Sequence, residues 1–305
     1  MSKNLLSPSF LIEDIQGSRV ISKRVLIRKK LISASNSLPE YSNHHLIKKR
    51  HAPKWIWHFF AGARYRRTMT RALPKIAKQI RFIALNWSFS ASDKDLCFLS
   101  KYFNELPALK MLSLRSPQND SPSVTNAGFN ELSRGLKKFS SLESLELFFP
   151  YYDHFIDKRL KILSQGIRVN TSLKSLKLNF SGCSQITDLG ICNLCKGLKN
   201  LGLLQNFSLD ISRCRFATNK GFLEIKKLMK ELRNLQQVRF DFSSWQGIDK
   251  NLIHSIVQDL DSLPLFRRIT IRLWRNKKLI KTEKHPSLNF ARRFLHLCCL
   301  KRKPL

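Results

Sequence analysis

Residues 173–198 read LKSLKLNFSGCSQITDLGICNLCKGL, and this stretch determines the fold. In its first half every second residue is apolar, which is typical of a strand with one buried face. These residues are Leu176, Leu178 and Phe180. In its second half the apolar residues follow the i, i+3, i+4, i+7 spacing of an amphipathic helix. They are Ile191, Leu194, Cys195 and Leu198. One strand followed by one helix is therefore the predicted unit.

The apolar-x-x-apolar-x-apolar phrase of this unit occurs seven times in the chain. The copies begin at Ile80, Leu109, Leu142, Leu173, Leu204, Leu235 and Phe266, with successive spacings of 29, 33, 31, 31, 31 and 31 residues. A period in this range is typical of a solenoid of stacked units, none of which buries its apolar face alone. We expect each unit to pack against its neighbours.

Aligning the units in columns predicts the layers of this solenoid. Two columns of the helical stripe stay apolar through five units. They are Phe129, Leu160, Ile191, Phe222 and Ile253, and Leu132, Leu163, Leu194, Ile225 and Ile256. Thr187 and Thr218 precede two of these helices and are suitable caps for their first turns. We expect an α/β solenoid with a strand and a helix in every unit, curved because a helix is wider than the strand spacing.

Residues 176–190, LKLNFSGCSQITDLG, resemble leucine-rich repeats of the ribonuclease-inhibitor-like and cysteine-containing subfamilies, above all in the run GCSQITD. The resemblance covers about residues 80–272. It implies a horseshoe of about seven repeats, with parallel β-strands on the concave face and α-helices on the convex face. Elsewhere the cysteine column drifts, and only Cys183 and Cys214 keep the thiol.

The excess of 55 basic over 21 acidic residues is concentrated at the two ends of the chain. Residues 1–79 carry 17 Lys and Arg against 3 Asp and Glu, and residues 272–305 carry 11 against 1. We predict four segments: a basic, partly disordered N-terminal extension over 1–53, a cap over 54–79, the repeat array over 80–272 and a basic C-terminal cap over 273–305. A short helix is expected over Ser287 to Leu300, where apolar residues have helical spacing.

The cysteines offer a metal site as one hypothesis. Cys192 and Cys195, with Cys183 and Cys214, could supply four thiolates to zinc, but the 31-residue spacing of the last two explains them as one buried column. No G-x-S-x-G, G-x-G-x-x-G or P-loop pattern occurs. We predict no enzyme, no metal and no cofactor.

Alternation also predicts the side chains on the concave face, whose charges are mixed. The candidate partner-binding residues are Phe82, Met111, Arg115, Glu146, Phe148, Lys177, Asp210, Arg239, Asp241, Arg268 and Arg272. Such a mixture suits a protein partner better than a phosphate backbone. The leading hypothesis is a non-enzymatic scaffold for protein–protein interaction, and the alternative is a solvated face without a partner.

The basic flanks support other readings. Aromatic and arginine residues over Lys54–Ile76 either cap the first repeat or bind nucleic acid or an anionic surface. Lys48–Arg50 with Arg64–Arg67 resembles a bipartite nuclear-import signal, and Cys298–Cys299 beside basic residues resembles an acylation site. The repeat family also implies a substrate-recognition subunit of a ubiquitin ligase, although no F-box pattern precedes the repeats. Without a signal peptide or an apolar run long enough for a membrane, we expect an intracellular protein, cytoplasmic or nuclear.

Overall fold

The computed structural model of the 305-residue chain describes residues 11–12, 56–60, 80–86, 92–116, 124–152, 154–243, 245, 249–273, 278–283 and 296–298. Most of the two basic flanks lies outside these residues, as do Trp87, which aligns with Phe149 in the strand column, and Asn119, which aligns with Cys183 in the cysteine column. Among the described helices, none has the length and apolar character needed to cross a bilayer.

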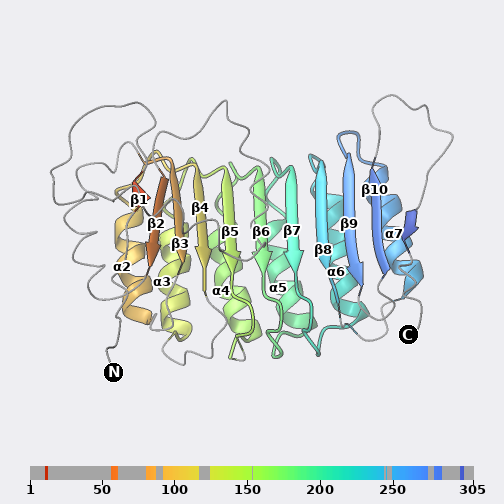
Figure 1. Cartoon of the computed structure of the whole chain (residues 1–305), viewed down its shortest axis with the longest axis horizontal. Coiled ribbons are helices and arrows are strands. Elements are labelled where there is room, and N and C mark those ends of the chain that lie inside the picture. Colours follow the sequence, from red (N-terminus) through yellow and green to blue (C-terminus); the bar gives the residue numbers. More distant parts are fainter. Residues whose placement is uncertain are drawn as a thin grey trace, which may run out of the picture.

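The strands form one eleven-stranded sheet in which spatial order follows chain order (Figure 1). They are β1 (Leu11–Ile12), β2 (Ile56–Phe60), β3 (Phe82–Asn86), β4 (Met111–Arg115), β5 (Ser144–Phe148), β6 (Ser175–Asn179), β7 (Asn206–Asp210), β8 (Gln237–Asp241), β9 (Arg268–Leu273), β10 (Lys278–Glu283) and β11 (His296–Cys298). Strands β2 to β9 are parallel, and β1, β10 and β11 pair antiparallel to their neighbours. Strands β3 to β9 are the seven predicted repeats.

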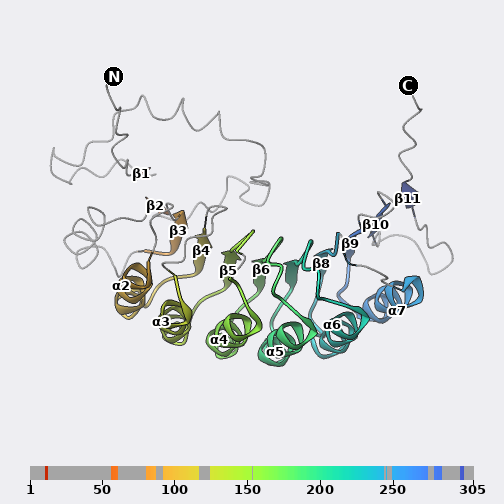
Figure 2. The ribbon, with the colours of Figure 1, turned by 90° about the horizontal axis from the view of Figure 1, so that it is seen from below.

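Six helices in the described part of the chain connect consecutive parallel strands, beginning after β3. They are α2 (Asp93–Phe103), α3 (Asn126–Leu136), α4 (Asp157–Ile167), α5 (Asp188–Leu198), α6 (Asn219–Glu231) and α7 (Lys250–Asp261). All six lie on one side of the sheet, so the strands line the inner face of an arch and the helices its outer face (Figure 2). The predicted α/β leucine-rich-repeat-like solenoid is confirmed.

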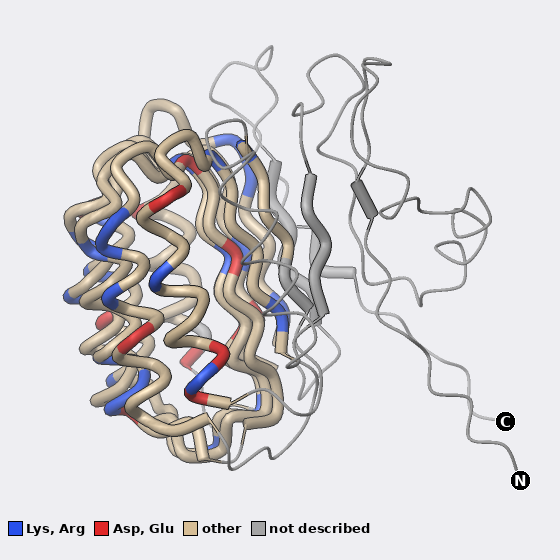
Figure 3. Tube along the Cα trace, turned by 90° about the vertical axis from the view of Figure 1, so that its left-hand side faces the viewer, with Lys and Arg blue, Asp and Glu red and all other residues tan. Residues whose placement is uncertain are grey.

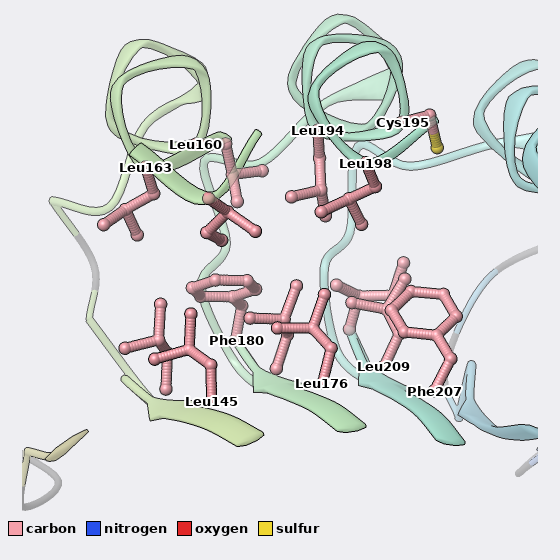
Figure 4. Packing of buried hydrophobic residues seen from close by; sticks show 14 of the residues in the cluster. Leu145, Leu160, Leu163, Leu176, Phe180, Leu194, Cys195, Leu198, Phe207 and Leu209 are labelled. Carbon is pink, nitrogen blue, oxygen red and sulfur yellow. The ribbon is translucent and has the colours of Figure 1, made fainter. Parts of the chain in front are cut away.

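The core lies between these two layers, where leucines and phenylalanines from the strands meet the helical stripes (Figure 4). Every member of the two predicted helix columns is buried, with exposed fractions between 0 and 3%. On the strand side, Phe149, Phe180, Ile211 and Phe242 recur at 31-residue spacing as one further column and are buried as well. Each such side chain contributes about 1.5–3 kcal/mol relative to exposure, which makes stacking the source of the fold's stability.

The cysteine column is part of this core. Cys183 donates a hydrogen bond to the Phe149 carbonyl at 3.1 Å, and Cys214 donates to the Phe180 carbonyl at 3.5 Å. One unit later Trp245 donates from its indole nitrogen to the Ile211 carbonyl at 2.9 Å. The column therefore supplies a donor to the preceding unit, and the predicted packing role of these cysteines is confirmed.

The two ends of the array differ from the sequence prediction. Among the described residues of the seventh unit there is no helix, and β9 is followed by β10, which pairs back onto it antiparallel. A hydrogen-bonded neighbour satisfies the backbone groups of the edge strand. His296–Cys298 form β11 on β10, so the helix predicted over Ser287 to Leu300 is wrong for these three residues. At the other end β2, inside the predicted cap, continues the parallel sheet.

Candidate protein-binding surface

The concave surface consists of three rows of residues that run across the strands in register. The first row is Phe82, Met111, Ser144, Ser175, Asn206, Gln237 and Arg268; the second is Ala84, Ser113, Glu146, Lys177, Ser208, Arg239 and Thr270; the third is Asn86, Arg115, Phe148, Asn179, Asp210, Asp241 and Arg272. All eleven predicted partner-binding residues lie in these rows. We call the three rows the concave face.

A charged cluster occupies the concave face at β4 to β6. Glu146 is 4% exposed and accepts hydrogen bonds from Lys177 Nζ at 2.6 Å, Ser113 Oγ at 3.1 Å and Arg115 Nη2 at 3.4 Å. Burial alone would raise the pKa of Glu146, but the adjacent Lys177 and Arg115 charges outweigh it and hold the pKa below its ordinary value. Glu146 is therefore ionised, and its carboxylate oxygens already accept hydrogen bonds from neighbouring residues of the concave face.

Phe148 extends this cluster toward the carboxyl ends of the strands. The Arg115 guanidinium carbon lies 4.3 Å from the centre of the Phe148 ring, a cation–π contact between neighbouring strands. Phe82 and Met111, the other apolar residues among the predicted partner-binding set, are partly exposed in the first row. The N-terminal half of the concave face thus presents apolar side chains around a neutralised carboxylate.

The carboxylates at β7 and β8 have a structural task that sequence reasoning missed. Asp210 accepts hydrogen bonds from the Ser212 backbone nitrogen at 3.0 Å and hydroxyl at 2.8 Å, and Asp241 accepts the same pair from Ser243 at 3.0 and 2.6 Å. Asn179 does the same for Ser181 one strand earlier. These bonds fix the turn that ends each strand.

The surroundings of Asp210 disfavour its charged form. Burial raises the pKa of Asp210, the neighbouring Asp241 charge adds to the rise, and the Ser212 bonds only partly offset it. Asp241 is bonded to Arg272 Nη1 at 3.1 Å. The recurring Asx-apolar-Ser triplets, NFS, DIS and DFS, are the sequence signal that could have revealed this role.

Toward β8 and β9 the concave face becomes basic and more exposed. Gln237, Arg239, Arg268 and Arg272 are exposed, whereas Ser113 and Glu146 in the earlier strands are buried. Basic and acidic residues of both layers are distinguished in Figure 3, which looks along the stack from its N-terminal end. The concave face therefore has an apolar end near β3 to β5 and a basic end at β8 and β9.

On the opposite layer, a repeated set of hydrogen bonds joins the N-termini of adjacent helices. Asp188, first in α5, accepts bonds from the Thr218 nitrogen at 2.8 Å, the Thr218 hydroxyl at 2.6 Å and the Gly221 nitrogen at 2.9 Å. Asp93 binds Thr125 and Gly128 in the same way. We call this arrangement the Asp-Thr-Gly junction.

In each Asp-Thr-Gly junction the threonine also caps its own helix, and the glycine makes room for the aspartate. Thr218 accepts a bond from the Lys220 nitrogen at 3.2 Å, as predicted for a helix cap. Asp157 binds the Thr187 nitrogen and hydroxyl at 2.9 and 2.6 Å. A Cβ on Gly190 would lie 2.1 Å from Asp157 Oδ1, so this position excludes a side chain.

Thiols and carboxylates do not gather into a metal site in the part of the chain that the structure describes, where no three His, Cys, Asp or Glu side chains are close enough together. Cys195 and Cys214 are buried, and burial raises the pKa of both thiols. Protonated, buried thiols are poor ligands and poor nucleophiles.

Comparisons with known proteins add little to this geometry. No family model matches the chain, and no curated protein matches it. Among solved structures, the chain is similar to the actin-binding site 2 of leiomodin-1, with a TM-score of 0.41 and 18% identity over 53% of this chain and 86% of that one. It is also similar to the tropomodulin C-terminal domain of Caenorhabditis elegans, with a TM-score of 0.40 and 15% identity over 55% and 92%. We infer no partner from similarities of this size.

Proposed function

We propose that the protein is a non-enzymatic scaffold that binds a protein partner through the concave face. The observation that supports this most is the registered set of rows, which gathers side chains from seven strands onto one continuous surface. The described helices all lie on the other side of the sheet. Repeat arrays of this kind use their extended concave surface for binding.

The two ends of the concave face indicate the chemistry of the partner. One end offers apolar contact area from Phe82, Met111 and Phe148. Apolar and aromatic side chains of this kind, once buried by a partner, commonly carry most of the binding energy of an interface. Arg239 and Arg268 offer exposed positive charge at the other. We therefore expect a partner with an apolar patch on one side and acidic residues on the other, which docks along the length of the sheet.

The test compares two pairs of charge reversals that alter net charge equally. Arg239→Glu with Arg268→Glu changes the concave face, whereas Arg168→Glu with Arg233→Glu changes exposed positions at the C-terminal ends of α4 and α6. Proteins captured from native lysate by each variant are quantified against the unaltered chain. The proposal expects partners lost with the first pair and retained with the second.

An identical captured set for both pairs would contradict binding through the concave face. Glu146, Asp210 and Asp241 are not used for this test, because each accepts hydrogen bonds that hold the fold. Reversal of those charges would leave buried donors without acceptors, so a loss of binding could then follow from unfolding.

A second candidate is nucleic-acid or anionic-surface binding by the basic flanks, for which the observation is the charge of residues 1–79 and 272–305. Binding by phosphate neutralisation releases counterions, so affinity should fall steeply as salt rises. A titration of the full chain with duplex DNA and single-stranded RNA at increasing salt tests this, and a flat response contradicts it.

The finer family assignment remains a prediction. The ribonuclease-inhibitor-like or cysteine-containing subfamily, the ubiquitin-ligase role and the intracellular location rest on the sequence patterns described above. So do the four segment boundaries, the import signal and the acylation site. A partner identified by the capture experiment would decide between a ligase subunit and another scaffold.

A further inference from the structure

The loops that lead from each helix to the next parallel strand lie along one edge of the arch, which we call the rim. They are residues 104–110, 137–143, 168–174, 199–205, 232–236 and 262–267. Strands β4 to β9 pair in register, so their first residues lie side by side at this edge, which is the upper one in Figure 1. The rim is therefore an extended row of loops, one from each unit.

The rim carries a large excess of positive charge. It has two carboxylates, Glu105 and Glu143, and Glu143 is already bonded to Lys110 and Lys174 at 2.9 and 3.0 Å. Its eight basic side chains are all exposed, and they are Lys110, Lys137, Lys138, Arg168, Lys174, Lys199, Arg233 and Arg267. The helical turns that lead into the rim do not reverse this excess, because they add Lys101, Arg134, Lys196 and Lys230 against Glu231, Asp259 and Asp261.

The opposite edge of the sheet lacks this excess. The connections from strand to helix are residues 87–92, 116–125, 149–156, 180–187, 211–218 and 242–249. In the sequence they contain two basic residues, Arg213 and Arg215, and three acidic ones, Asp120, Asp153 and Asp249. Cations stabilise the negative end of a helix dipole, which explains some of the basic residues of the rim. It does not explain the apolar residues among them.

Three large apolar side chains of the rim are exposed to solvent. Val169, Leu203 and Leu265 have exposed fractions of 49, 53 and 47%, and each belongs to a different connection. The residues that follow the two leucines, Leu204 and Phe266, are buried in the core. The core is therefore filled without these three side chains, which remain available for an external contact.

Hydrogen bonds fix the loops that carry two of these side chains. The buried Asn170 amide donates to the Leu136 carbonyl at 3.0 Å and to the Gly166 carbonyl at 2.9 Å. Beside Leu203, the Gly202 carbonyl accepts a bond from the Asn234 amide of the next unit at 2.6 Å. Val169 and Leu203 are therefore held outward by loops that are tied to neighbouring units.

From these observations we propose that the rim docks on an anionic phospholipid bilayer, with its basic side chains at the headgroups and Val169, Leu203 and Leu265 at the boundary with the acyl chains. Anionic lipids attract Lys and Arg near the membrane surface, and apolar side chains enter the interface. Peripheral attachment commonly needs both signals together.

The arrangement favours a bilayer over other anionic partners. A nucleic-acid backbone would neutralise the basic side chains but would bury no aliphatic groups, since its affinity comes from phosphate neutralisation. A protein partner would need three separate apolar pockets along the rim, whereas a bilayer accepts apolar side chains at any spacing. A row of loops along one edge also suits a flat surface.

The rim is separate from the surfaces considered above. It contains none of the eleven predicted concave residues, which all lie in strands, so bilayer binding and protein binding can fail independently. Substitutions in the rim also leave the basic flanks unaltered. A loss of membrane binding in such variants therefore cannot be assigned to the flanks.

The experiment measures sedimentation of the full chain with vesicles of phosphatidylcholine and phosphatidylserine at near-physiological salt. The triple variant Val169→Ser, Leu203→Ser, Leu265→Ser keeps the net charge and should weaken vesicle binding by about tenfold or more. The matched control Leu189→Ser, Phe216→Ser, Leu223→Ser removes exposed apolar side chains outside the rim and should change binding by less than about twofold. Circular dichroism checks that both variants fold.

A charge variant gives an independent reading and decides the question if the apolar variant does not fold. Arg168→Gln with Lys199→Gln removes two exposed rim cations and should weaken vesicle binding by about tenfold. The control is Lys158→Gln with Lys220→Gln, two exposed lysines in the first turns of α4 and α6. It changes the net charge equally and should weaken binding by less than about threefold.

Several outcomes would overturn the proposal. One is equal losses in the rim variants and their controls, because a chain with net charge +34 attracts anionic surfaces generally. Failure of the unaltered chain to sediment with the vesicles is another, as is equal binding to vesicles of phosphatidylcholine alone. Duplex DNA is titrated in parallel. If the Arg168 and Lys199 substitutions weaken DNA binding and leave vesicle binding unchanged, the rim is a nucleic-acid surface.

Discussion

Two junctions on the helical layer differ in the number of hydrogen bonds that join adjacent units. At the α5–α6 junction, Asp188, Thr218 and Gly221 form three hydrogen bonds between units. At the α3–α4 junction the equivalent contact is one bond from Arg159 to Asn126. The regular junction holds the stack together with its own groups, whereas the irregular one leaves a buried guanidinium nitrogen unsatisfied.

The regular columns record the demands of stacking, because three junctions keep the same residue types in them. Two junctions depart in all three columns, to Asn126, Ile156 and Arg159 at α3–α4 and to Asn219, Asp249 and Leu252 at α6–α7. The α6–α7 junction keeps a capping side chain, since Asp249 accepts a bond from the Asn251 nitrogen at 2.8 Å.

The largest expected effect comes from moving the irregular residue into a regular junction. In Gly190→Arg, the new Cβ would lie 2.1 Å from Asp157 Oδ1 and displace the carboxylate that binds Thr187. Overpacking and lost hydrogen bonds should lower the free energy of unfolding by about 3 kcal/mol. Gly202→Arg is the matched control, because nothing lies within 4 Å of its Cβ, and it should change stability by less than about 0.5 kcal/mol. Urea denaturation followed by circular dichroism measures both.

Removal of the aspartate should have the next largest effect. Asp188→Ala leaves the Thr218 and Gly221 donors without their acceptor and should cost about 2 kcal/mol in urea denaturation. The equivalent Asn126→Ala removes one bond and should cost about 1 kcal/mol. Equal costs would show that the regular junction is no stronger than the irregular one.

Loss of a cap gives a smaller effect. Thr218→Ala removes the oxygen that accepts from the Lys220 nitrogen and donates to Asp188, and it should lower the free energy of unfolding by about 1 kcal/mol. Thr218→Ser retains the hydroxyl and should restore most of this stability in thermal denaturation. A serine variant as unstable as the alanine variant would indicate that the threonine methyl group, and not the cap, stabilises α6.

The smallest expected effect is a gain at the irregular junction. Ile156→Thr provides the cap that α4 lacks, and because Ile156 is 38% exposed the loss of apolar burial is small. The free energy of unfolding should rise by about 0.5 kcal/mol. A decrease in the melting temperature of this variant would mean that Ile156 packs more tightly than its exposure suggests.

The sequence predicted the array well because its columns are dictated by burial. Phe129, Leu160, Ile191 and the rest of the helix columns are buried where the 31-residue spacing placed them. The same reasoning identified the concave face, since alternation decides which side chains point away from the core. It could not identify the neutralisation of Glu146 or the turn bonds of Asp210, because both depend on contacts between units.

The ends of the array were not predictable from periodicity. Lys278–Glu283 has no strong apolar alternation, and its strand forms because the edge of β9 offers unpaired backbone groups. Arg159 was missed for a different reason. It lies outside the apolar columns, so the periodicity that predicts the core carries no information about it.

The antiparallel strands that close the sheet have a consequence for assembly. A parallel stack has no intrinsic length, since each last strand is a template for a first strand of another copy, and head-to-tail growth of this kind produces filaments. Strand β1, the first strand of the described sheet, runs against β2, whereas at the other end β10 reverses the chain direction and β11 restores that of β9. In a head-to-tail stack, β1 of one molecule would therefore meet β11 of the next in antiparallel orientation, and the parallel register would be interrupted at β1.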